Sequence, residues 1–434
     1  MPRTELLAPA GNLNNLRYAL AYGADAVYAG MPRYSLRVRN NDFHKLENLA
    51  AGIQATHAAG KHFYLASNGL PHNAKIKTFI QDMEPVIALG PDALIMADPG
   101  LILMVRERWP EMTLHLSVQA NTMNYASVRF WQQQGISRVI LSRELSLDQI
   151  EEIRQHCPEM ELEVFVHGAL CIAYSGRCLL SGYFNHRDAN QGTCTNACRW
   201  DYKVKEGLLD DNGDISGVHT STAHPAQQVY LLEENSRPGS QMPIEEDEHG
   251  TYIMNSRDLR ALEHVERLVN MGVKSLKIEG RTKSHYYVAR TTQIYRRAID
   301  DAMAGRPFDA SQLGLLENLS NRGYTDGFLQ RHPDQDYQNY LESQSSSCRQ
   351  RFVGALTGYD RDSGMASIDV RNRFAVGDEL ELITPAGNRT FRLEQMCDMD
   401  GNPVTVAPGS GHHVQIPLAE VAVEMGLLAC NLQS

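Results

Sequence analysis

Eight short apolar segments recur along the first 280 residues, and most are continuously hydrophobic rather than alternating. Strands of this kind are buried on both faces, as in a parallel sheet covered by helices. Eight strand-then-helix units predict an α/β protein with a (β/α)8 TIM-like barrel, and a doubly wound open sheet is the alternative. The segments begin at Glu5, Ala26, His62, Ala93, Thr113, Arg138, Leu162 and Ser275.

The segments between these strands carry helical patterns. Two of them, at 14–23 and 75–90, end at Gly23 and Gly90, as helix C-termini often do. Ser146 and Gln149 form a capping-box pattern at the start of another. A further helical unit is expected over 256–272, directly before the eighth strand.

The barrel pattern is interrupted once, between the seventh and eighth strands. We expect a cysteine-rich and acidic insertion there, at about 168–250, inside a barrel domain of residues 1–305. Residues 206–248 hold ten acidic residues and one basic residue, and so contribute −9 to the net charge of −11. The rest of the chain is therefore close to neutral, so the net charge does not exclude a local basic surface for phosphate.

The chain changes character after the barrel. Residues 306–347 are polar and irregular, which predicts a linker, and residues 348–434 show short alternating runs typical of a small antiparallel β-barrel. Domains of this kind often bind RNA or a partner, or simply pack on the first domain, and the sequence leaves these alternatives open. The N-terminus has no secretory pattern, and no apolar run is long enough for a membrane span, so we expect a cytoplasmic protein.

Four of the eight cysteines, Cys171, Cys178, Cys194 and Cys198, lie within 28 residues. Thiolates are soft ligands that suit an iron–sulfur cluster or zinc. Zinc sites prefer two closely spaced pairs, and only the second pair is close, so an iron–sulfur cluster is favoured over zinc or no metal. The chain lacks the His-Glu-x-x-His and Gly-x-Ser-x-Gly motifs of proteases.

A distinctive motif surrounds the first two cysteines. It reads Glu163-x-Phe165-x2-Gly168-Ala169-Leu170-Cys171-x4-Gly176-x-Cys178-x-Leu180-Ser181. Further motifs are ELLAPAGN at Glu5, GADAVYAG at Gly23, HRDANQGTCTNACRW at His186 and SLKIEGRTKS at Ser275. Together they resemble the collagenase-like peptidase family U32, and the resemblance covers nearly the whole chain.

This resemblance implies oxygen-independent hydroxylation rather than proteolysis, on tRNA uridine, ribosomal RNA cytidine or the ubiquinone ring. The chain is most similar to members that form 5-hydroxyuridine at the tRNA wobble position with prephenate, the first step toward 5-carboxymethoxyuridine. It also implies a [4Fe–4S] cluster on the four cysteines, with tRNA, the iron–sulfur assembly machinery and an unknown electron donor as partners, and no membrane. Cys198 is the only local candidate for the fourth ligand.

Active sites of such barrels lie at the C-terminal ends of the strands, so polar residues there are candidates. His167, Glu279 and Arg281 are expected to be catalytic, although packing and a salt-bridge network are the structural alternatives. The expected substrate-binding residues are Arg33, Arg37, Arg39, Gln119, Asn121 and Arg143. Arginines suit phosphates or carboxylates, and the two amides suit a pyrimidine edge. Lys283, His285 and Arg290 on the last helix are expected to extend this surface.

Overall fold

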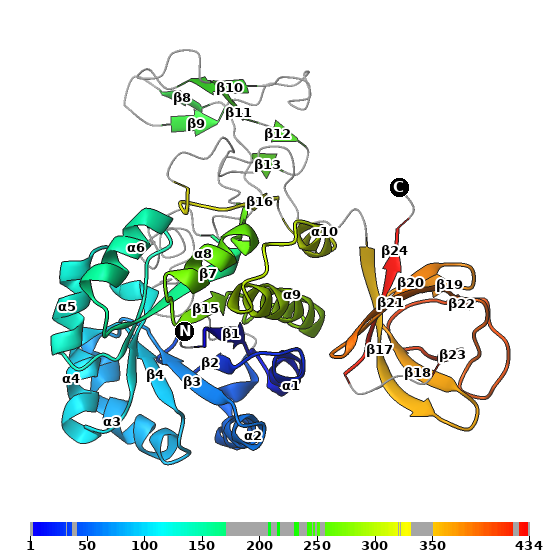
Figure 1. Cartoon of the computed structure of the whole chain (residues 1–434), viewed down its shortest axis with the longest axis horizontal. Helices are drawn as coiled ribbons and strands as arrows, with labels where there is room; N and C mark the ends of the chain where they lie inside the picture. Colours follow the sequence, from blue (N-terminus) through cyan, green and yellow to red (C-terminus); the bar gives the residue numbers. More distant parts are fainter. Residues whose placement is uncertain are drawn as a thin grey trace.

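A computed structural model shows a barrel followed by a second domain (Figure 1). The structure describes residues 3–31, 33–36, 41–170, 257–319, 321, 323–330, 350–419 and 425–432, together with the backbone of short strands between 207 and 251. Those short strands form three antiparallel pairs. They are β8 (Gly207–Leu209), β9 (Ile215–Gly217), β10 (Tyr230–Glu233), β11 (Gln241–Ile244), β12 (Glu246–Asp247) and β13 (Gly250–Thr251).

Eight parallel strands form the barrel. They pair in the order β15-β1-β2-β3-β4-β5-β6-β7, and pairing of β15 with β7 closes the ring. This closure confirms the TIM-like barrel and excludes the open sheet. The strands are β1 (Glu5–Pro9), β2 (Ala26–Gly30), β3 (His62–Ser67), β4 (Ala93–Met96), β5 (Leu114–Leu116), β6 (Arg138–Ile140), β7 (Glu161–Ala169) and β15 (Ser275–Ile278).

Helices surround the barrel (Figure 1). The predicted helix ends are confirmed: Gly23 and Gly90 have φ of 103° and 72°. The capping box of Ser146 and Gln149 is also present. In the described residues, no helix has both the length and the apolar character needed to cross a bilayer. The helices are α1 (Leu13–Ala21), α2 (Leu46–Ala58), α3 (Asn73–Ile87), α4 (Pro99–Arg108), α5 (Tyr125–Gln133), α6 (Leu147–His156), α8 (Val265–Asn270), α9 (His285–Met303) and α10 (Ser311–Glu317), with short 3-10 turns η1 (Asp42–His44), η2 (Val118–Ala120) and η6 (Leu262–His264).

The helical prediction over 256–272 is wrong in its first part. Residues Asp258–Arg260 form strand β14, which pairs antiparallel with the end of β7, and β16 (Tyr324–Thr325) pairs with β14. Strand β7 extends beyond its barrel neighbours, and its exposed backbone groups need hydrogen-bond partners. The 258–260 segment supplies them, so a tertiary contact overrides the local helical pattern.

A bulge in β7 changes which side chains face the barrel interior. Lys277 of β15 pairs with Phe165, but Ile278 pairs with His167, so Val166 is an extra residue in β7. An extra residue breaks the two-residue alternation of a strand. Phe165 therefore lines the mouth of the barrel, whereas the ring of His167 contacts Tyr287 and Tyr295 of α9.

The second domain was predicted as a small antiparallel β-barrel, and it contains an antiparallel sheet of six strands in the order β21-β20-β24-β17-β18-β23. It has its own core, which includes Val353, Ile368 and Phe374. The strands are β17 (Gln350–Asp360), β18 (Met365–Val370), β20 (Glu379–Thr384), β21 (Gly387–Arg392), β23 (His413–Pro417) and β24 (Leu427–Asn431), and β19 (Phe374–Ala375) pairs separately with β22 (Val406–Ala407).

The second domain packs beside α9 and α1 (Figure 1). The hydroxyl of Tyr22, the residue after α1, donates to the Ile383 carbonyl oxygen of β20 at 3.0 Å. The rings of Tyr286 and Phe352 stack with centroids 4.8 Å apart. Arg290 of α9 is fully buried and pairs with Glu381 of β20, so it does not extend a surface for RNA.

Candidate functional site

A pocket opens at the C-terminal ends of the barrel strands, where barrel enzymes carry their active sites. Its lining comes from β2, β3, β4, β6, β7 and β15, from the loops after β2, β3, β6 and β15, and from residues 117–119 after β5 (Leu114–Leu116). We call it the mouth pocket. Its polar lining residues are Tyr28, Asn68, Ser117, Gln119, Arg143, Lys277, Glu279 and Arg281.

Arg143 follows β6 and lies against the aromatic wall of the mouth pocket. Its guanidinium carbon is 3.7 Å from the centroid of the Phe165 ring, within the range of a cation–π contact. The arginine side chain is 10% exposed. Its closest described carboxylate oxygen is Glu279 Oε2, 4.0 Å away, which is the outer limit of an ion pair. This geometry leaves room for an acceptor closer to the guanidinium.

Glu279 and Arg281, both predicted, line the mouth pocket beyond the end of β15. The Tyr28 hydroxyl lies 3.3 Å from Glu279 Oε2. Arg281 Nη2 donates to the Leu36 carbonyl oxygen at 2.6 Å. Gly30 makes this approach possible, since a Cβ there would lie 2.3 Å from Arg281 Nη1. The backbone of the loop after β2 therefore holds Arg281, and the side chain of Tyr28 in β2 contacts Glu279.

Lys277 is a pocket residue that was not among the predicted site residues. Its ammonium nitrogen donates to Glu163 Oε1 at 2.8 Å and lies 4.3 Å from the centroid of the Tyr28 ring. The lysine is 3% exposed, and burial lowers its pKa, whereas the Glu163 charge opposes that shift. The signal was the alternation within β15, which places Lys277 on the same face as Ser275 and Glu279.

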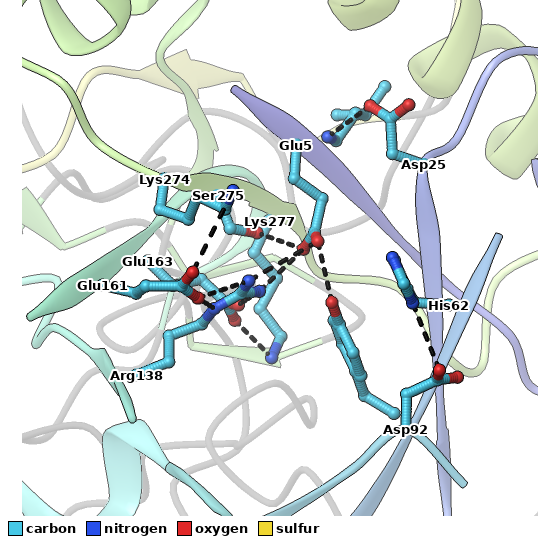
Figure 2. A network of polar contacts seen from close by, with 12 residues as sticks. Glu5, Asp25, His62, Asp92, Arg138, Glu161, Glu163, Lys274, Ser275 and Lys277 are labelled. Carbon is cyan, nitrogen blue, oxygen red and sulfur yellow. Dashed lines mark hydrogen bonds and ion pairs between the residues drawn. The ribbon is translucent and has the colours of Figure 1, made fainter. Parts of the chain in front are cut away.

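A buried charge network lies beneath the mouth pocket. Arg138 Nη1 is 2.7 Å from Glu5 Oε1 and 3.3 Å from Glu163 Oε2. The Tyr64 hydroxyl donates to Glu5 Oε2 at 2.7 Å. Figure 2 shows Arg138 and Lys277 pointing into this group of carboxylates. Each carboxylate has a cationic or hydroxyl partner, which offsets the cost of burying its charge.

His167, predicted as catalytic, is not with the other predicted residues. It is fully buried between β7 and α9, and the Tyr295 hydroxyl lies 3.3 Å from its Nδ1. Burial lowers the pKa of His167 to about 3, so its ring is neutral near pH 7. A neutral imidazole packed among tyrosines fits the structural alternative of the sequence analysis.

Of the remaining predicted substrate-binding residues, some line the mouth pocket and others do not. Gln119 lines the mouth pocket, but Asn121 has a left-handed backbone (φ 50°) and is not in the pocket lining. Arg33 is 47% exposed and pairs with Asp82 of α3 at 2.6 Å, away from the pocket. Arg37 and Arg39 lie outside the described residues.

The four cysteines Cys171, Cys178, Cys194 and Cys198 also lie outside the described residues. Within the described part of the chain, no group of three or more histidine, cysteine or acidic side chains could hold a metal ion. Ala169, the last residue of β7, lines the mouth pocket, and Cys171 follows it by two positions. Cys171 therefore follows, in the sequence, a strand that borders the mouth pocket.

Comparison with known proteins gives matches to both domains. Residues 11–339 match the profile of peptidase family U32, and residues 348–429 match the family's C-terminal domain. Several relatives are named "tRNA hydroxylation protein P". The one from Escherichia coli (strain K12) is 61% identical, with 97% of this chain and 95% of the relative covered. The one from Haemophilus influenzae is 56% identical, with 99% and 96% covered.

A more distant relative has a different substrate in its name. It is a 23S rRNA 5-hydroxycytidine synthase of Escherichia coli (strain K12), 31% identical. The match covers 69% of this chain and 39% of the relative.

Proposed function

The chain belongs to peptidase family U32, and we propose that it is a tRNA hydroxylase. The observation that carries this proposal is the high identity, across both domains, to relatives named for tRNA hydroxylation. The motif resemblance gives the finer form of the proposal. The product is 5-hydroxyuridine at the wobble position, the first step toward 5-carboxymethoxyuridine, and prephenate is the required metabolite.

The mouth pocket supports chemistry on a base that has left its stack. An enzyme that modifies the ring of a base must take that base out of the helix or loop and enclose it. Gln119 offers an amide that can both donate to and accept from a pyrimidine edge. Tyr28 and Phe165 supply aromatic walls for the ring.

We propose that Cys171, Cys178, Cys194 and Cys198 hold a [4Fe–4S] cluster beside this pocket. Four thiolates are the donor set that such clusters use. When bound, the cluster supplies electron transfer. The assembly machinery and an electron donor of unknown identity would then be partners, in the reducing cytoplasm where thiolates persist.

Two measurements test the cluster. Protein purified without oxygen should contain about four iron and four sulfide per chain, as a cubane cluster requires. Cys171→Ala should abolish both, whereas Cys157→Ala, at a buried cysteine that follows α6, should leave both unchanged. Zinc without sulfide, or equal loss in the two variants, would contradict the proposal.

The activity is tested by mass spectrometry of nucleosides. Deleting the gene should remove 5-hydroxyuridine and its derivatives from tRNA, and the wild-type chain should restore them. Ribosomal RNA and ubiquinone are measured in the same strains. Loss of hydroxycytidine from ribosomal RNA or of ubiquinone, with tRNA unchanged, would favour the other substrates of the family.

Proteolysis is the second candidate, because of the family name. A serine protease needs a histidine within hydrogen-bond reach of its hydroxyl. Ser117 is the serine of the described pocket lining, and it is contacted at 3.0 Å by the Asn68 amide instead. We therefore expect no peptide hydrolysis from this serine.

A further inference from the structure

Arg143 is a cation of the mouth pocket with one long ion pair among the described residues. Its side chain is nine-tenths buried, and its only described ion pair, to Glu279, spans 4.0 Å. An ordinary hydrogen bond from a guanidinium to a carboxylate is about 2.8 Å long, so this pair is not one. Stacking on Phe165 fixes the plane of the guanidinium and leaves its edge for a planar acceptor.

A second cation lies close to Arg143. The Lys277 ammonium is 5.3 Å from the same Phe165 centroid that Arg143 contacts at 3.7 Å. The two cations are therefore no more than about 9 Å apart. Lys277 donates one of its three N–H groups to Glu163, and its ammonium lies over the aromatic ring of Tyr28. The pair forms a cationic end to a pocket with aromatic walls.

From this arrangement we infer that Arg143 and Lys277 form a carboxylate-binding subsite for a small organic acid. The planar fork of an arginine matches a carboxylate in bidentate fashion. The depth of the two residues argues against an RNA phosphate, since a flipped nucleotide brings its base, and not its backbone, to the deepest point. The aromatic walls favour an acid with an unsaturated or apolar ring.

This inference relies on the proposed function only for the identity of the acid. If the chain hydroxylates tRNA with prephenate, the subsite holds a carboxylate of prephenate while the base occupies the Gln119 side. The subsite itself is tested by binding, without turnover, so that a failure of the tRNA assay and a failure of this inference are separate results.

The test is calorimetric titration of prephenate into the full-length protein, purified without oxygen. Arg143→Gln should weaken binding by about 10- to 100-fold, the effect expected for a lost charged hydrogen bond. Arg143→Lys keeps the charge but not the fork, and should recover only part of the affinity. Arg260→Gln is the matched control. Arg260 also lies over an aromatic ring, that of Tyr324, and also forms an ion pair, with Glu317, but it does not line the mouth pocket. The affinity of the Arg260→Gln variant for prephenate should equal that of the wild type.

Two further experiments distinguish an organic carboxylate from an RNA phosphate or free phosphate as the anion that Arg143 binds. The anticodon stem-loop of a tRNA should bind Arg143→Gln and the wild type with equal affinity in a fluorescence anisotropy assay. Inorganic phosphate at equal concentration should compete poorly with prephenate. Unchanged prephenate binding in Arg143→Gln, a selective loss of RNA binding, or equal competition by phosphate would each overturn the carboxylate subsite.

Discussion

Arg290 of α9 and Glu381 of β20 form a two-pronged ion pair across the boundary between the two domains. Arg290 Nη1 and Nη2 lie 2.9 Å and 3.2 Å from the two carboxylate oxygens, and the arginine is fully buried. Gln350 also donates to Glu381, at 2.6 Å, and Tyr286 donates to Gln350. A buried network of this kind fixes one arrangement of the domains, because any other arrangement leaves charges without partners.

Replacing Arg290 should therefore destabilise the whole chain. Arg290→Met leaves the Glu381 carboxylate buried without its cation, which typically costs about 3–5 kcal/mol. Urea unfolding would measure the loss, and the double variant with Glu381→Gln should recover part of it. Arg297→Met, on the same helix but 61% exposed, is the control and should change stability by no more than about 1 kcal/mol. Equal effects at the two arginines would contradict the role of the buried pair.

Lys277 should behave in the same way inside the barrel. Lys277→Met removes the cation 2.8 Å from Glu163, a residue with no exposed surface, and should cost about 3–5 kcal/mol. Adding Glu163→Gln should reduce that cost, since the buried carboxylate that Lys277→Met leaves with Arg138 as its cationic partner is then neutral. Lys274→Met, at a partly exposed lysine 4.0 Å from Glu161, is the control. If the double variant unfolds more easily than the sum of the single variants predicts, the pair is not coupled as described.

Gly168 lies close to Glu279, which lines the mouth pocket. Its φ is 106°, and a Cβ there would lie 2.5 Å from the Glu279 carbonyl oxygen. Gly168→Ala should therefore cost about 3 kcal/mol or more and displace Glu279, because backbone strain and a clash add together. Gly60→Ala is the matched control, with φ 66° and no atom within 4 Å, and should cost about 1–2 kcal/mol from strain alone. Similar costs in urea unfolding would show that the clash relaxes.

Much of the fold could be predicted because local patterns encode it. Continuous apolar strands indicated the barrel, and Ser146 and Gln149 indicated the start of a helix. Polar residues after strand ends, among them Arg143, Glu279 and Arg281, were predicted at the mouth and line the pocket there. These predictions needed only the strand positions and the rule that strand C-termini carry the site.

The errors have tertiary causes. Strict alternation along β7 places His167 on the face of Phe165, but the extra residue Val166 breaks that alternation, and a bulge has no clear sequence signature. The 258–260 segment became a strand because β7 needed a partner. Arg290 looked like a surface cation because its partner Glu381 is 91 residues away in the sequence. No local pattern contains such a pairing.

The buried state of His167 predicts how stability depends on pH. The pKa of His167 is about 3 in the folded chain and about 6.5 in an unfolded one, so below pH 6.5 the unfolded state binds a proton that the folded state does not. The free energy of unfolding should therefore fall as the pH falls, by about 2 kcal/mol between pH 7 and pH 5 from this residue. The range from pH 7 to pH 5 lies above the folded pKa of His167, so the free energy of unfolding continues to fall below pH 5.

Urea unfolding of His167→Gln should show a flatter pH dependence than the wild type, but not a flat one, because burial also lowers the pKa of His115. His72→Gln, at an exposed histidine that makes no capping hydrogen bond at the start of α3, is the control, and equal flattening in the two variants would contradict a buried neutral His167.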